Sequence, residues 1–223
     1  MNVSIGLVYD LIFLILLVGA ALDGRRRGFV SGLVSLIGSV AGVVAGVYAS
    51  RAWALPLYRD HLGVTIGETV AATLNDCGGD FNAALAKLEF LPDAARETLR
   101  TLVTNLTGEA VPQIVSALEP VFLPLIQTLL FLAVWILVRA VFRLIARWLR
   151  GINAIPLVGT LNKMLGLAFG VVAGLLNCWI FSLAVWMVSG LTGGRLEFLS
   201  SGALAHSRIY TLLSGLNPFL LHY

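Results

Sequence analysis

The sequence predicts an all-α integral membrane protein with four transmembrane helices and an external amphipathic helical insertion between the second and the third. Hydrophobic residues make up 58% of the chain and charged residues only 12%, whereas roughly a quarter of a soluble domain is charged. Uncharged apolar stretches cover 28–50, 121–138 and 164–194, and each reaches the roughly 17 to 25 residues that a spanning helix needs. The mean hydropathy of +0.91 therefore reflects spans that a bilayer would bury.

The first span is predicted over 3–22, although Asp10 lies within it. A carboxylate near one end of a spanning helix can reach the interface at a lower cost than one at the bilayer centre. A cleaved signal peptide would carry its positive charges before the apolar region, but here Arg25, Arg26 and Arg27 follow it. We therefore expect an uncleaved first span.

The other spans are predicted over 28–49, 121–142 and 164–189, and the basic residues orient them. Segment 51–120 holds nine acidic residues against five basic ones, while the loops after the first and third spans are rich in arginine. Because positive residues are retained in the cytoplasm, both termini are expected outside and the two arginine-rich loops inside. This orientation fits a multi-pass protein of the bacterial inner membrane.

The chain is accordingly divided into four segments: a first transmembrane hairpin (1–50), an external amphipathic helical insertion (51–120), a second transmembrane hairpin (121–190) and an external amphipathic tail (191–223). The third helix is expected to continue into the cytoplasm as far as Trp148. It carries a cytoplasmic basic stripe at helical spacing, which consists of Arg139, Arg143, Arg147 and Arg150. Anchors that reach the interface are the favoured interpretation, and a stripe that binds lipid phosphates or nucleotides is the alternative.

Within the insertion, "LPDAARETLRTLVTNL" (91–106) predicts an amphipathic helix, because its apolar residues recur at helical spacing: Leu99, Leu102, Val103 and Leu106. We expect it to cap the bundle or lie in the headgroup plane rather than bind a partner helix. A short helix is predicted over 111–118, before Pro120 and Pro124 mark the entry into the third span. The tail at 207–221 is also amphipathic and is expected to lie back on the outer surface.

Glycines four residues apart occur in the second and fourth spans, and "GVVAG" occurs in both. Small residues at this spacing allow helices to approach closely in lipid. We therefore expect the second and fourth helices to pack together, within one chain or between chains, through Gly38, Gly42, Gly46, Gly166, Gly170 and Gly174. A parallel internal duplication and a glycine-lined pore remain open as alternatives.

Asp10, Gln127 and Asn177 are the polar candidates within the predicted spans. Polar residues in a membrane are functional candidates. The structural alternative is that Asp10 caps a helix and that Gln127 and Asn177 form interhelical hydrogen bonds.

Catalytic and metal-binding patterns are missing from the sequence. The two cysteines and three histidines show no metal-ligand spacing, so no metal and no cofactor are expected. No Ser/His pair, HExxH or GxGD-like element lies in a span, and we expect no catalytic residues and no enzymatic activity.

The stretch "YDLIFLILLVGAALDGRRRGFVSGLVSLIG" (9–38) resembles the amino terminus of the colicin V production protein (CvpA) family. The resemblance rests on Asp10 and on the Arg-Gly-Phe-Val signature that begins with Arg27, Gly28 and Phe29. In the second half, "VGTLNKMLGLAFGVVAGLL" (158–176) is similar to a family motif of an acidic or amide residue, a basic residue and spaced glycines, placed here on Asn162, Lys163, Gly166, Gly170 and Gly174.

The resemblance covers roughly 8–50 and 120–218, where "HSRIYTLLSGLNP" is similar to the family's tail, and the long insertion is typical of the Gram-positive branch. Asn162 and Lys163 stand where the family usually has Asp and Arg, and Ala173 stands where a basic residue often occurs. The resemblance implies a non-enzymatic inner-membrane protein that supports toxin (colicin V) production or secretion and envelope homeostasis.

The expected partners are the lipid bilayer and a second copy or another membrane protein, with no nucleic acid. A small-solute or ion channel or transporter formed by glycine-packed helices is the alternative function.

Overall fold

The computed structural model describes residues 2–88, 91–103, 110–152, 159–192 and 196–219, and every regular element in these ranges is helical. Three long helices form the body of the molecule: α1 (Asn2–Leu57), α5 (Ala110–Ile152) and α6 (Gly159–Thr192). The remaining elements are the π-helical turn η1 (Tyr58–Leu62), α2 (Gly63–Asp76), α3 (Phe81–Lys87), α4 (Asp93–Val103), the 3-10 turn η2 (Glu197–Leu199), α7 (Ser201–Ala205) and α8 (Arg208–Ser214). Three of the described helical stretches are long and apolar enough to cross a membrane: Ile5–Asp76, Pro112–Trp148 and Thr160–Thr192.

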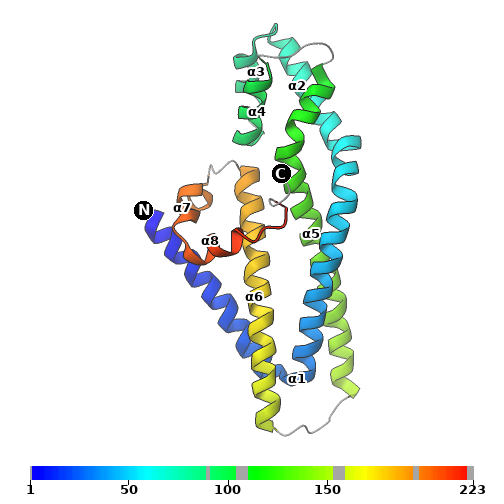
Figure 1. Cartoon of the computed structure of the whole chain (residues 1–223), viewed down its shortest axis with the longest axis vertical. Coiled ribbons are helices and arrows are strands. Elements are labelled where there is room, and N and C mark those ends of the chain that lie inside the picture. Colours follow the sequence, from blue (N-terminus) through cyan, green and yellow to red (C-terminus); the bar gives the residue numbers. More distant parts are fainter. Residues whose placement is uncertain (1, 89–90, 104–109, 153–158, 193–195, 220–223) are drawn as a thin grey trace.

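Helix α1 contains both of the first two predicted spans and bends sharply at one residue, Gly28, whose φ is 76° and ψ is −177°. Figure 1 shows the resulting V, with an N-terminal arm (2–27) and a C-terminal arm (29–57). The predicted loop at Arg25 to Arg27 is therefore wrong, because these residues are helical. A left-handed backbone conformation, which glycine adopts without a Cβ penalty, turns the chain within one residue, so no loop is needed.

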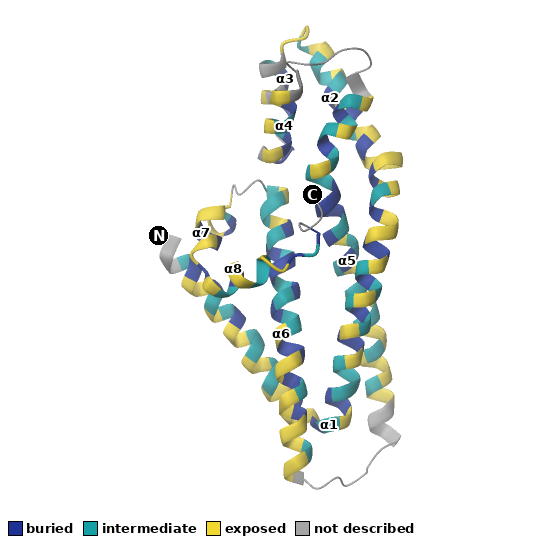
Figure 2. Cartoon of the chain, viewed as in Figure 1, coloured by how far each residue is buried: buried dark blue, intermediate teal, exposed yellow. Residues whose placement is uncertain are grey.

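Helix α6 packs chiefly against α1, helix α5 packs against the C-terminal arm of α1, and α5 and α6 touch each other much less. A buried cluster consists of Phe131 of α5, Ile180 and Leu183 of α6 and Phe219 of the tail, and the C-terminal arm of α1 packs against it through Val43 and Val47. Large apolar side chains remain exposed along the long helices (Figure 2), among them Leu14, Ile15, Val44, Ile136 and Leu137. Exposed apolar surface on this scale fits lipid, since soluble proteins rarely expose large continuous apolar patches.

At the end of the molecule opposite the Gly28 bend, α2 and α4 pack against the first turns of α5 around a small apolar core. Its fully buried members are Val70, Leu88, Leu91, Ala95, Leu99, Ile114 and Leu118. The predicted amphipathic helix at 91–106 corresponds to α4, whose Leu99 enters this core, while residues 104–106 lie outside the described ranges. The predicted short helix at 111–118 is wrong as a separate element, since α5 runs without interruption through Pro120 and Pro124.

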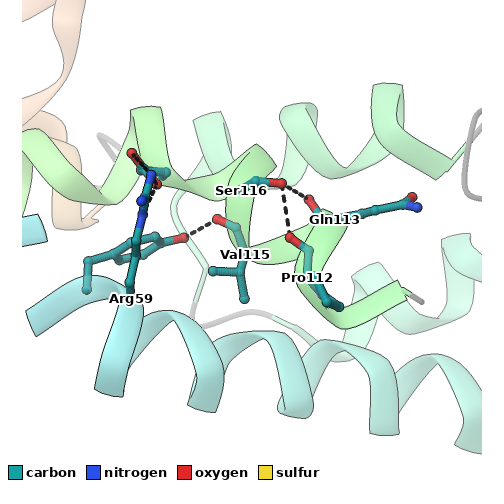
Figure 3. Close-up of polar contacts among 7 residues, drawn as sticks. Arg59, Pro112, Gln113, Val115 and Ser116 are labelled. Carbon is teal, nitrogen blue, oxygen red and sulfur yellow. Dashed lines mark hydrogen bonds and ion pairs between the residues drawn. The ribbon is translucent and has the colours of Figure 1, made fainter. Parts of the chain in front are cut away.

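Polar contacts connect η1 to the first turns of α5 (Figure 3). The hydroxyl of Tyr58 donates a hydrogen bond to the carbonyl of Val115 at 2.6 Å. Arg59 forms an ion pair with Glu119 at 3.0 Å. Burial, assisted by the charge of Glu119, raises the pKa of Tyr58 to about 12, so the phenol remains a neutral donor at physiological pH.

Candidate functional site

Asp10 connects the N-terminal arm of α1 to the tail. Its Oδ1 accepts hydrogen bonds from the hydroxyl of Ser207 at 2.6 Å and from the backbone N–H of Ile209 at 3.1 Å. Ser207 is itself the N-cap of α8, and its hydroxyl oxygen accepts from the N–H of Tyr210. Carboxylates are favoured at helix N-termini, where N–H groups lack helical partners. Asp10 is therefore a cap, but of a helix almost two hundred positions away in the sequence.

One side of the tail packs against the helical body, while Leu212 and Leu216 remain exposed on its other side. The ring of Tyr210 is buried near that of Tyr9, and Phe219 is only 2% exposed, against Phe131 of α5. Burial raises the pKa of Tyr210 to about 12. Ile209 and Leu213, two of the apolar residues that predicted an amphipathic tail, are partly buried in this contact, and Asp10 binds the first residues of α8 there.

The family-motif residues of the two halves meet at the Gly28 bend. The backbone N–H of Phe29, which begins the C-terminal arm, donates to Oδ1 of Asn162 at 2.6 Å. Gly28 lies so close to the Asn162 amide that a Cβ on it would be 2.7 Å from Nδ2. Lys163 is exposed beside this contact. In the family motif, Gly28 thus forms the bend, and the Asn162 side chain caps the helix arm that begins after it.

We expect Asn162→Ala to lower the free energy of unfolding by about 1 kcal/mol, as the loss of an N-cap does. Asn162→Asp is expected to raise it by about 0.3–1 kcal/mol, because a carboxylate interacts favourably with a helix N-terminus. Denaturant titration of the purified protein in detergent measures both. Asn75→Ala, at an exposed asparagine of α2, is the control. Equal stability of Asn162→Ala and the wild-type protein would contradict the capping role.

The predicted packing of the second span on the fourth through their glycines is wrong for the contacts within this chain. Cβ atoms on Gly38, Gly42 and Gly46 would meet Phe142, Trp135 and Phe131, all on α5. The bulky aromatic residues of α5 need this glycine face, so it is not available to α6.

The glycines of α6 pack against the N-terminal arm of α1 instead. A Cβ on Gly166 would collide with the carbonyl of Gly24, one on Gly170 would lie 2.5 Å from the carbonyl oxygen of Ala20, and one on Gly174 would lie 3.0 Å from Leu17. The sequence reasoning missed Gly24, although Ala20, Gly24 and Gly28 show the same four-residue spacing of small residues. Glycines of both faces thus contact other helices, although Gly170 also lines a cavity between α1, α5 and α6.

Two adjoining cavities lie between the arms of α1, α5 and α6, with volumes of about 450 Å³ and 300 Å³. Both are lined by Asp23, Arg27, Ser31, Ser35 and Arg139. The larger one also has Arg143 and Arg147 in its wall, and the smaller one has Asn177. We call the two together the basic cleft. The predicted basic stripe thus faces this cleft through its first three members, while the side chain of Arg150 is outside the described part.

Arg139 and Asn177 meet inside the basic cleft. Nη1 of Arg139 donates a hydrogen bond to Oδ1 of Asn177, and the guanidinium lies 4.8 Å from the centre of the Trp135 ring. The sequence predicted an interhelical role for Asn177 but did not indicate its partner. Gln127 is half-buried on α5.

Charge in the cleft is unbalanced. Asp23 forms an ion pair with Arg27 at 2.8 Å. Among the described residues that line the cleft, Asp23 is the only acid and faces four arginines. No group of three His, Cys, Asp or Glu side chains within the described residues could hold a metal ion.

The bent α1, the long α5 and α6 and the exposed apolar surface define a multi-pass helical membrane protein. The family model described as Colicin V production protein matches residues 102–218, which is just over half of the chain, so the chain belongs to this family. The match includes the Asn162 motif and the tail that Asp10 caps. No curated protein and no solved structure matches the chain.

Proposed function

We propose that this chain is a non-enzymatic protein of the bacterial inner membrane that supports colicin V production or secretion and envelope homeostasis. The two arms of α1 together with α5 and α6 form four spans. The Gly28 bend and the connection between α5 and α6 lie in the cytoplasm, because the arginines just before the bend and at the end of α5 then satisfy the positive-inside rule. Both termini and the insertion lie outside. Membership in the Colicin V production protein family supports this role.

The observation that carries the non-enzymatic part of the proposal is the contact of Asp10 with α8. An intramembrane carboxylate is a candidate catalytic or transport group by default. Here both of its hydrogen bonds go to the protein's own tail, and Asn162 caps the C-terminal arm in a similar way. These polar side chains stabilise a particular helix arrangement, which is what an assembly or scaffold protein requires.

Complementation tests the proposal. In a colicin V-producing strain that lacks its own family member, we expect the wild-type chain to restore extracellular toxin activity and growth in detergent. Gly170→Leu is expected to restore neither, because its side chain would force α6 off α1. Val172→Leu should restore both, since Val172 is an exposed residue of the same helix. Normal membrane levels of the wild-type chain without any restoration would contradict the proposed role.

One observation favours the alternative, a channel or transporter for small solutes or ions: the basic cleft reaches Arg139 within the helical body. Flux of an anion into liposomes that contain the purified wild-type chain, lost in Arg139→Gln, would establish this alternative in place of the supporting role. Liposomes with folded, correctly oriented protein and no flux would leave the supporting role in place.

A further inference from the structure

We propose that the basic cleft binds a phosphate-type oxyanion, held by the guanidinium groups of Arg139 and Arg143 and by the hydroxyl groups of Ser31 and Ser35. Phosphate monoesters or diesters, as in a lipid headgroup or in a soluble phosphate, share this chemistry. The site does not depend on the role proposed above, and it is assigned from the cavity and its lining alone.

The charge of the cleft is the first argument. Four arginines and one aspartate line it, and the aspartate is already paired with Arg27. Arg139, Arg143 and Arg147 therefore share a concave surface whose one acidic residue among the described lining residues is already paired. Low-dielectric walls strengthen their mutual repulsion, and a bound anion would relieve it.

The position of Arg139 is the second argument. Gly38 contacts Phe142 and Gly42 contacts Trp135, so Arg139, which lies between these two α5 residues in sequence, is level with Gly38 to Gly42. That level is about ten residues from the Gly28 bend, or about 15 Å at 1.5 Å per residue. A charge at such a depth is costly, and side chains of this kind mark ligand or ion sites.

The fixed geometry of Arg139 is the third argument. One of its five N–H donors goes to Asn177, and the Trp135 ring supports its planar face. The remaining donors suit an oxyanion, because guanidinium binds phosphate through paired hydrogen bonds. Arginines that only anchor a helix would extend towards the interface, whereas Arg139, Arg143 and Arg147 all line the same cavity.

Thermal unfolding of the full chain in a maltoside detergent, which carries no phosphate, tests the site, because a ligand that binds the folded state raises the unfolding midpoint. One arm titrates inorganic phosphate against chloride at constant ionic strength, and the other adds phosphatidylglycerol to the detergent micelles. Arg143→Gln removes a cleft arginine. Arg26→Gln removes the same charge from an exposed position that does not line the cleft. If Arg143→Gln does not fold, Arg147→Gln replaces it as the variant that lacks a cleft arginine.

We expect one of the two arms to stabilise the wild-type chain and the Arg26→Gln control alike. In Arg143→Gln the apparent dissociation constant should rise by about tenfold or more, as the loss of a charge-assisted hydrogen bond implies. Stabilisation by inorganic phosphate identifies a soluble phosphate as the ligand class, and stabilisation by phosphatidylglycerol alone identifies a headgroup. No stabilisation in either arm, or an equal loss in Arg143→Gln and Arg26→Gln, would overturn the proposal.

Discussion

Gly170→Ala is expected to lower the free energy of unfolding by about 1–3 kcal/mol, the usual cost of adding a carbon to a tightly packed contact. The new Cβ would lie 2.5 Å from the carbonyl oxygen of Ala20 and 3.0 Å from Cα of Ala21. Both are backbone atoms of a helix that cannot move aside alone. The two helices would have to separate, which would also loosen the contact of Gly166 with Gly24.

Gly19→Ala is the matched control for this experiment, because it makes the same chemical change on the helix that Gly170 contacts. Its Cβ would enter open space, so the higher helix propensity of alanine should stabilise the protein by up to about 1 kcal/mol. Denaturant titration in detergent measures both variants. We expect the free energy of unfolding to fall in Gly170→Ala and to rise in Gly19→Ala. Equal changes in the two variants would show that α6 does not pack on the N-terminal arm through this face.

Asp10→Ala is expected to lower the free energy of unfolding by about 1–3 kcal/mol, the cost of leaving partly buried donors without an acceptor. The N–H of Ile209 and the hydroxyl of Ser207 would both lose their bond to the carboxylate. Because α8 is held by this cap, its release should precede unfolding of the long helices. Faster hydrogen exchange at the amides of α8, measured by mass spectrometry in nanodiscs, is the specific result expected.

Two further variants separate the cap from a general charge effect. Asp10→Asn keeps an acceptor oxygen at the same place and is expected to retain most of the protection of α8. Asp60→Ala removes an exposed carboxylate of η1 and should leave exchange in α8 unchanged. Protection of α8 that is identical in Asp10→Ala and the wild-type chain would show that the tail is held by its apolar contacts alone.

Local residue patterns were sufficient to determine the helical class and the membrane-length stretches. Uncharged runs of this length identify helices because every backbone polar group in lipid must be bonded within its own segment. The amphipathic helix α4 was also predictable from the sequence, since the spacing of its apolar residues shows which face is buried. Spaced glycines showed that close helix contacts exist, and the family motifs indicated which residues matter.

The partners of those residues were decided only by the tertiary structure. Glycine spacing specifies a flat face but not the helix that packs on it, so the sequence paired the second span with the fourth, whereas the structure pairs it with α5. The bend was missed for a related reason: the left-handed backbone at Gly28 needs only one residue, and the preceding arginines continue the helix that contains them.

The sequence by itself determined that this is a helical membrane protein with a basic stripe, because composition, hydropathy and helical period are properties of single segments. The tertiary structure alone decided that Asp10 caps α8, that Asn162 caps the C-terminal arm, and that the stripe faces a cleft that also contains Asp23 and Asn177. These contacts join residues far apart in the chain. Their geometry depends on how α6 and the tail pack against the bent α1, and no local residue pattern determines this packing.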